Sequence, residues 1–195
     1  PVPFVISHQE WRALEAGLLQ RARLLNAVLK DLYGAQSLLR DGSIPSTLVV
    51  GNPHFLRACH GIKTPGDIYL HFMAIDVARA PDGRWWVLSD RTQAPAGAGF
   101  ALENRIVVST TLPEMYRDSQ VMRLAPFFQA LHRHLIKIAP RDGPHIVLLT
   151  PGPSRDTYFE HSYLARYLGF SLVEGADLTV RDDKVYLKTL GGLQQ

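Results

Sequence analysis

A strand–helix–strand pattern near the end of the chain most constrains what this sequence can fold into. Ile146 to Thr150 is a short apolar run that predicts a strand, and a helix is predicted from about Thr157 to Leu168, ending at Gly169. Phe170 to Val173 predicts a second strand. This order predicts an α/β fold with a parallel βαβ unit, in which the first strand is buried on both faces.

The beginning of the chain predicts a long amphipathic helix. Ser7 and Glu10 have the spacing of a capping box. An apolar stripe at spacings of three and four residues follows, consisting of Trp11, Leu14, Leu18, Ala22, Leu25, Leu29 and Leu32. Gly34 is expected to end the helix in a left-handed conformation. Such a helix needs a packing partner for its stripe, and its basic residues are expected on the solvated side.

The middle of the chain alternates between short elements and turns. Short helical pieces are predicted at 36–40 and 54–60, strands at 68–78 and 85–89, helices at 100–110 and 124–138, and a second hairpin at 178–188. The Pro-Asp-Gly turn at 80–84 predicts that the first two strands form a hairpin. The character of the sequence changes after Pro113. We therefore expect a boundary near residues 113–122, with a helical segment and a hairpin in 1–115 and the parallel βαβ unit in 116–195.

Composition excludes several classes of function. The formal charge of +3 is the difference between 21 basic and 18 acidic residues, which is small for a nucleic-acid-binding protein. Cys59 is the only cysteine, so neither an intrachain disulfide nor a thiolate metal cluster can form. No apolar run approaches the roughly 20 residues that span a bilayer. We expect a soluble, cytoplasmic protein with neither nucleic acid nor membrane as a partner. Because the chain lacks an initiator Met, we also expect it to belong to a longer one.

The common signatures of metal and nucleophilic catalysis are missing from the sequence. His132 and His134 are two residues apart on a predicted helix and therefore face different directions, and the other six histidines are scattered. We predict no metal site. No serine lies in a nucleophile-elbow pattern, Cys59 has no evident base, and no glycine-rich phosphate loop is present.

Two loop segments are candidates for a binding site. In the first, a strand ends at Asp90-Arg91-Thr92-Gln93, and a small-residue loop with Gly97 and Gly99 leads into a helix. Backbone N–H groups and the positive end of that helix can face an anion there. In the alternative interpretation, the loop is an ordinary connection whose polar side chains cap the helix.

The second segment runs from Thr150 through Gly152 to Tyr158, Glu160 and His161. It places a loop and a helix N-terminus at the carboxyl end of a parallel strand, where α/β sheets bind ligands. The alternative is that Asp156 or Thr157 only caps the helix. Both interpretations remain open at this point.

Three segments of the chain, two of them in two parts, resemble the circularly permuted ATP-grasp family. This family includes eukaryotic-type glutathione synthetases and glutathionylspermidine synthetase. The segments are Tyr69 to Asp76, Asp90 to Pro95 with Ala101 to Arg105, and Leu148 to Pro153 with Tyr158 to His161. The resemblance implies an ATP- and magnesium-dependent carboxylate–amine ligase that forms an acyl phosphate. It implies that residues 1–115 supply the catalytic strand and that residues 116–195 are a Rossmann-like region that binds the substrate. It also implies that the nucleotide-binding lobe comes later in the sequence, so that this chain alone holds no cofactor and is inactive.

The resemblance breaks at Ser89-Asp90-Arg91, where many relatives carry Glu-Asp-Asn with the Glu and Asn as metal ligands. A guanidinium repels Mg²⁺, so we expect Arg91 either to replace the ion or to pair with Asp90 or Glu103. A non-catalytic binding or scaffolding module is therefore the alternative to a ligase. The candidate residues for binding a carboxylate, an amine or an anion are Asp90, Arg91, Thr92, Gln93, Gly97, Gly99, Glu103, Asn104, Arg105, Thr150, Gly152, Tyr158, Glu160 and His161.

Overall fold

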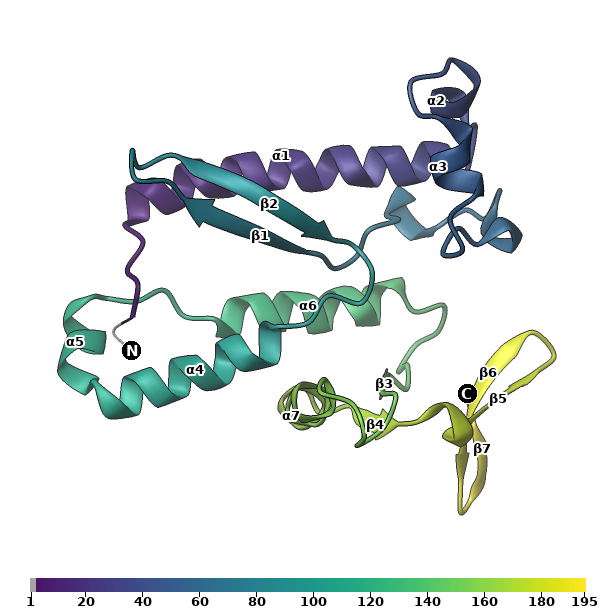
Figure 1. Cartoon of the computed structure of the whole chain (residues 1–195). Helices are drawn as coiled ribbons and strands as arrows, with labels where there is room; N and C mark the ends of the chain where they lie inside the picture. Colours follow the sequence, from purple (N-terminus) through teal and green to yellow (C-terminus); the bar gives the residue numbers. More distant parts are fainter. Residues whose placement is uncertain (1–2) are drawn as a thin grey trace. The chain divides into compact units, whose positions relative to one another are not determined.

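The computed structural model describes residues 3–195, which form two compact units that divide between Pro95 and Ala96 (Figure 1). The division lies about twenty residues before the boundary expected near residue 115. It groups residues by contact, so the assignment of 1–115 and 116–195 to separate functional regions stays a prediction.

Both units contain helices and strands. The first unit contains α1 (His8–Leu32), α2 (Ser37–Arg40), α3 (Ser46–Val50), the 3₁₀ helices η1 (Arg57–Cys59) and η2 (Pro65–Asp67), β1 (Ala74–Arg79) and β2 (Trp85–Arg91). The second contains α4 (Ala98–Thr111), α5 (Pro113–Asp118), α6 (Ala125–Ile138), β3 (Val147–Leu149), α7 (Tyr158–Leu168), β4 (Ser171–Val173), η3 (Gly175–Asp177), β5 (Leu178–Arg181), β6 (Lys184–Thr189) and β7 (Gly192–Gln194). The sequence did not predict α3, α5 or β7. Within residues 3–195, no helix combines the length and the apolar character that crossing a bilayer requires.

The start of α1 agrees with the prediction, and its end does not. Ser7 Oγ accepts from the Glu10 N–H at 3.2 Å, and the Glu10 carboxylate accepts from the Ser7 N–H at 3.4 Å, which completes the capping box. The prediction that Gly34 ends the helix in a left-handed conformation is wrong. The left-handed residue is Gln36, with φ 54°, because the Asp31 carboxylate accepts from the N–H groups of the next helix and draws the chain directly into α2.

The predicted hairpin forms from β1 and β2, which pair antiparallel and lie beside α1 (Figure 1). β1 begins at Ala74, six residues after the predicted start at residue 68. The reason is that the Asn26 side chain of α1 accepts from the N–H groups of Tyr69 and Leu70, at 2.8 and 3.0 Å, before the strand begins. β2 extends two residues beyond the predicted end and finishes at Arg91.

The second unit contains the predicted parallel βαβ arrangement. β3 and β4 pair in parallel, and α7 connects them and ends at Gly169 in the left-handed conformation, with φ 74°. The prediction that the first strand is buried on both faces is wrong, because Leu149 is 56% exposed. In the part of the chain that the structure describes, this sheet has two strands, so β3 has a neighbour along one edge only. The predicted hairpin at residues 178–188 forms from β5 and β6, with both turn residues at positive φ.

Candidate functional site

Two ion pairs between a carboxylate and an arginine lie at the end of β2, one on each face of the hairpin. The Ser89 hydroxyl donates to the Asp76 carboxylate on the neighbouring strand, and Arg91 Nε donates to the same carboxylate at 2.9 Å. Asp90 faces the other way and accepts two hydrogen bonds from Arg21 of α1, at 2.7 and 2.6 Å. Successive residues of a strand point to opposite faces, so Ser89 and Arg91 share one face of the hairpin and Asp90 lies on the other.

Both carboxylates are stabilised in the charged form. The hydrogen bonds from Ser89 and then Arg91 hold the pKa of Asp76 below its ordinary value of 3.8. The hydrogen bonds from Arg21 likewise hold the pKa of Asp90 below 3.8. These contributions to stability are complete above the ordinary value and are lost as the pH falls through the lowered one. At neutral pH both carboxylates are therefore ionised, and each ion pair has no net charge.

These residues do not fit the magnesium ion that the family resemblance implies. Magnesium requires oxygen ligands in octahedral geometry, and here a guanidinium occupies one candidate ligand position and a serine hydroxyl, already bonded to Asp76, the other. Among residues 3–195, no group of three or more His, Cys, Asp or Glu side chains is arranged to hold a metal ion.

Arg91 pairs with neither of the partners that the sequence suggested. Asp90 points to the opposite face of the hairpin, and Glu103 lies against Tyr163. The actual partner is Asp76, which the register of the hairpin places opposite Ser89. Sequence analysis missed Asp76 and Arg21 as members of this cluster. The hairpin register could have indicated Asp76, whereas no signal in the sequence indicated Arg21.

In the second unit, a buried carboxylate lies at the start of α4. Glu160 of α7 is 2% exposed, and its Oε1 accepts from the N–H groups of Gly97 at 2.7 Å and Gly99 at 2.9 Å. These are the backbone groups that the sequence offered to an external anion. The chain's own carboxylate occupies the positive end of α4, so a ligand would have to displace Glu160 to use these donors.

The other residues of the second loop segment form a neighbouring hydrogen-bonded group. The Thr150 hydroxyl, in a residue only 2% exposed, lies 3.0 Å from His161 Nδ1 and accepts from the Gly152 N–H at 3.3 Å. Gly152 has φ 97°, and a Cβ there would lie 3.2 Å from the carboxylate of Glu174. Sequence analysis missed Glu174, which lies after β4 and far along the chain from the loop.

The structure brings some of the candidate residues together and leaves others apart. The second unit contains two neighbouring hydrogen-bonded groups, one of Glu160 with Gly97 and Gly99 and one of Thr150 with Gly152 and His161. Asp90 and Arg91 end β2 in the first unit. Thr92, Gln93 and Asn104 are exposed, whereas Arg105 and Tyr158 are half-buried. Thr157 is the N-cap residue of α7, as the alternative interpretation allowed, but its side chain makes no capping hydrogen bond. A binding role for the candidate residues stays a prediction.

Comparison with known proteins adds a family and several relatives. Residues 3–195 match the family described as circularly permuted ATP-grasp type 2. An uncharacterized protein of Mycobacterium tuberculosis is 45% identical over 197 residues, covering 100% of this chain and 22% of that protein. An uncharacterized protein of Synechocystis is 39% identical over 196 residues, covering 100% of this chain and 41% of that protein. The chain thus spans less than half the length of these relatives.

Proposed function

Because the chain belongs to the circularly permuted ATP-grasp type 2 family, we propose that it is the substrate-binding part of an ATP-dependent ligase that joins a carboxylate to an amine. The observation that carries the proposal is the family match, which extends over residues 3–195. ATP and magnesium are held by other parts of the full-length protein in this proposal, and the chain alone is inactive.

The proposed reaction has two balanced steps. The substrate carboxylate attacks the γ-phosphorus of ATP, giving an acyl phosphate and ADP. The amine then attacks the acyl carbon and an amide bond forms. Inorganic phosphate leaves with the electrons of the broken C–O bond and takes up the proton that the amine nitrogen loses. Negative charge gathers on phosphate and carboxylate oxygens in both steps, so the site needs fixed positive charge.

Arg91 supplies such a charge in this proposal. Its Nε is bonded to Asp76, and within residues 3–195 its two terminal nitrogens have no hydrogen-bond partner. Asp76 therefore orients the guanidinium and leaves two donors for a carboxylate or phosphate. The pair is partly exposed, at 56% for Arg91 and 39% for Asp76, so a ligand can reach it.

A non-catalytic binding or scaffolding module is the second candidate. The observation that favours it is that the chain's own carboxylates already lie at both candidate anion positions. Asp76 accepts from one nitrogen of Arg91, and Glu160 accepts from the N–H groups at the start of α4. The two candidates differ in whether Arg91 responds to an external anion.

Melting curves of the wild-type chain and Arg91→Ala, each with and without millimolar phosphate, separate the candidates. If Arg91 binds the anion, phosphate should raise the melting temperature of the wild type, since a ligand that binds only the folded state stabilises it. The substitution should remove most of that increase. Arg117→Ala on α5 removes the same charge from an exposed position and should keep the wild-type response. Equal increases in wild type and Arg91→Ala would contradict the proposed role and favour the module.

A further inference from the structure

A surface cavity of about 350 Å³ lies between α6 and the last turn of α7 in the second unit. α6 lines it with Phe128, Gln129, His132 and Arg133, α7 contributes Tyr167, and two aliphatic residues complete the lining. The α6 residues recur at spacings of one, three and four, so they share one face of the helix. The volume is at the lower end of the range of about 300–1,000 Å³ that is typical of small-molecule sites.

The apolar part of this cavity is an ordered group of aromatic rings. Phe128 is only 3% exposed and packs edge-on against Tyr167, with ring centroids 5.1 Å apart. The His132 ring stacks on Phe170, at a centroid distance of 5.5 Å and an interplanar angle of 12°. Ring contacts on both sides limit the rotation of these side chains. The cavity therefore offers a preformed surface for the flat face of a ligand.

The polar part is rich in donors and contains no acidic side chain among the lining residues. Four polar side chains of the cavity make no hydrogen bond or ion pair with any residue in the described part of the chain: those of Gln129, His132, Arg133 and Tyr167. A single exposed arginine is commonly just solvated. Here the arginine shares one cavity with three further polar groups and an aromatic surface. Solvation of a helix face alone would not bring these groups together.

The charge of the cavity favours an anion. The carboxyl end of α7, at Leu168, contributes a partial negative charge of about half an elementary charge. Arg133 contributes a full positive charge and exceeds it. Since no carboxylate within residues 3–195 pairs with Arg133, a ligand's negative charge meets an unpaired guanidinium.

We propose that this α6–α7 cavity binds a small organic carboxylate with a planar apolar body. The ring of the ligand packs against the exposed ring of Tyr167, which the buried Phe128 supports, and its carboxylate accepts from Arg133, with Gln129 as a further donor. The proposal does not depend on ligase activity, and the cavity contains none of the candidate residues at the end of β2.

Benzoate is the probe for this site, tested by titration into the ¹⁵N-labelled chain of 195 residues. Saturable shifts should concentrate on the backbone amides of residues 125–133 and 167–168. Benzamide has the same shape without the charge and should bind at least about fivefold more weakly, because a charge-assisted hydrogen bond is lost. Arg133→Ala should weaken benzoate binding by a similar factor, and Arg133→Lys should recover part of it.

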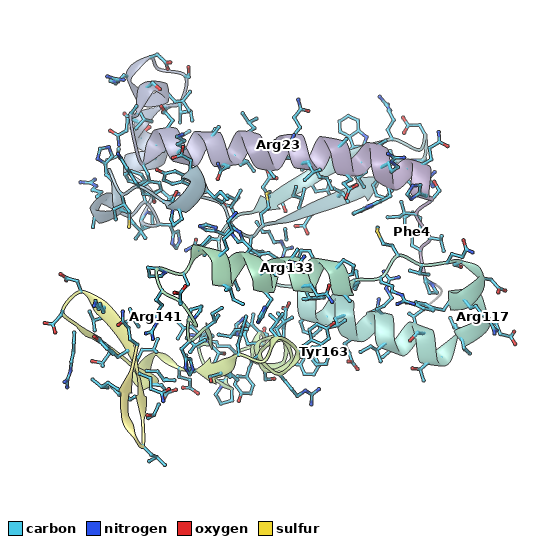
Figure 2. All side chains as sticks on the ribbon, turned by 180° about the vertical axis from the view of Figure 1, so that it is seen from behind. Phe4, Arg23, Arg117, Arg133, Arg141 and Tyr163 are labelled. Carbon is cyan, nitrogen blue, oxygen red and sulfur yellow. The ribbon has the colours of Figure 1, made fainter. Side chains whose placement is uncertain are left out.

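Two controls make the result specific. Arg117→Ala changes the net charge equally but lies on α5, outside the cavity, and should bind benzoate like the wild type (Figure 2 labels Arg117 and Arg133 on their separate helices). In Arg91→Ala the benzoate shifts of residues 125–133 and 167–168 should persist, whereas any shifts at the end of β2 should disappear, so failure of the proposed ligase site and failure of this site are distinguishable. Equal shifts with benzoate and benzamide, benzoate binding unchanged in Arg133→Ala, or shifts confined to residues outside α6 and α7 would each overturn the proposal. The benzamide comparison is decisive even if an arginine variant fails to fold.

Discussion

Replacing Glu160 with glutamine should destabilise the chain by about 2–4 kcal/mol, although the substitution preserves the shape of the side chain. The buried carboxylate accepts from the N–H groups of Gly97 and Gly99 at the positive end of α4. Glutamine has one acceptor oxygen in place of two and carries an NH₂ group, which would face N–H donors. The substitution also removes the negative charge that the start of the helix favours.

Urea unfolding followed by far-UV circular dichroism measures this loss. All three tryptophans, Trp11, Trp85 and Trp86, lie in the first unit, so tryptophan fluorescence alone would not report on the second. Glu114→Gln is the matched control, because Glu114 is exposed in the first turn of α5, and its effect should stay within about 0.5 kcal/mol. Amide exchange at Gly97 and Gly99 should accelerate only in Glu160→Gln. An equal midpoint for the two variants would show that Glu160 does not hold the start of α4.

Replacing Gly99 with alanine should destabilise the same contact from the other side, by about 1–3 kcal/mol. A Cβ on Gly99 would lie 2.7 Å from Glu160 Cγ and 3.2 Å from Leu164 Cγ, closer than packed carbons approach. Either α7 moves away or the Glu160 carboxylate loses its hydrogen bonds to α4. The backbone conformation is not the obstacle, because Gly99 has ordinary helical geometry; the cost comes from crowding.

Gly17→Ala in α1 is the matched control and should have the opposite sign. A Cβ on Gly17 has no atom within 4 Å, and Gly17 lies in the interior of a helix. Alanine there should stabilise the helix by about 0.5–1 kcal/mol, because glycine loses more backbone entropy. The measurement is the urea midpoint of both variants against wild type. Stabilisation by both substitutions would contradict the close packing of α4 on α7.

Local signals in the sequence correctly predicted the elements that are stabilised by residues close together in the chain. The capping box of α1 involves residues three apart, and the hairpin turns carry Asp and Gly at positions that require them. The parallel βαβ unit followed from the order of apolar runs. Where a distant side chain decides the backbone, the predictions were wrong. Asn26 delays the start of β1 by bonding Tyr69 and Leu70. Asp31 holds the start of α2, and Gln36 in place of Gly34 takes the left-handed conformation.

The candidate sites show the same limit. The sequence indicated that the loop before α4 presents N–H groups at a helix N-terminus, and the structure has this geometry. It could not indicate that Glu160, more than sixty residues later, fills the position, because that depends on how α7 packs on α4. Likewise, Arg91 was recognised as an unusual cation, but its partner Asp76 follows from strand register and not from local sequence.

The most direct test of the proposed function is hydroxamate formation by a full-length family member that contains this chain. Hydroxylamine replaces the unknown amine and traps an acyl phosphate as a hydroxamate, which iron(III) reveals by colour. The assay contains ATP, Mg²⁺, hydroxylamine and pools of amino acids and dicarboxylates. A ligase should form hydroxamate and ADP in a one-to-one ratio, dependent on one carboxylate pool, and Arg91→Ala should lower the rate. No hydroxamate and no carboxylate-dependent ADP with any pool would contradict the ligase and leave the non-catalytic module.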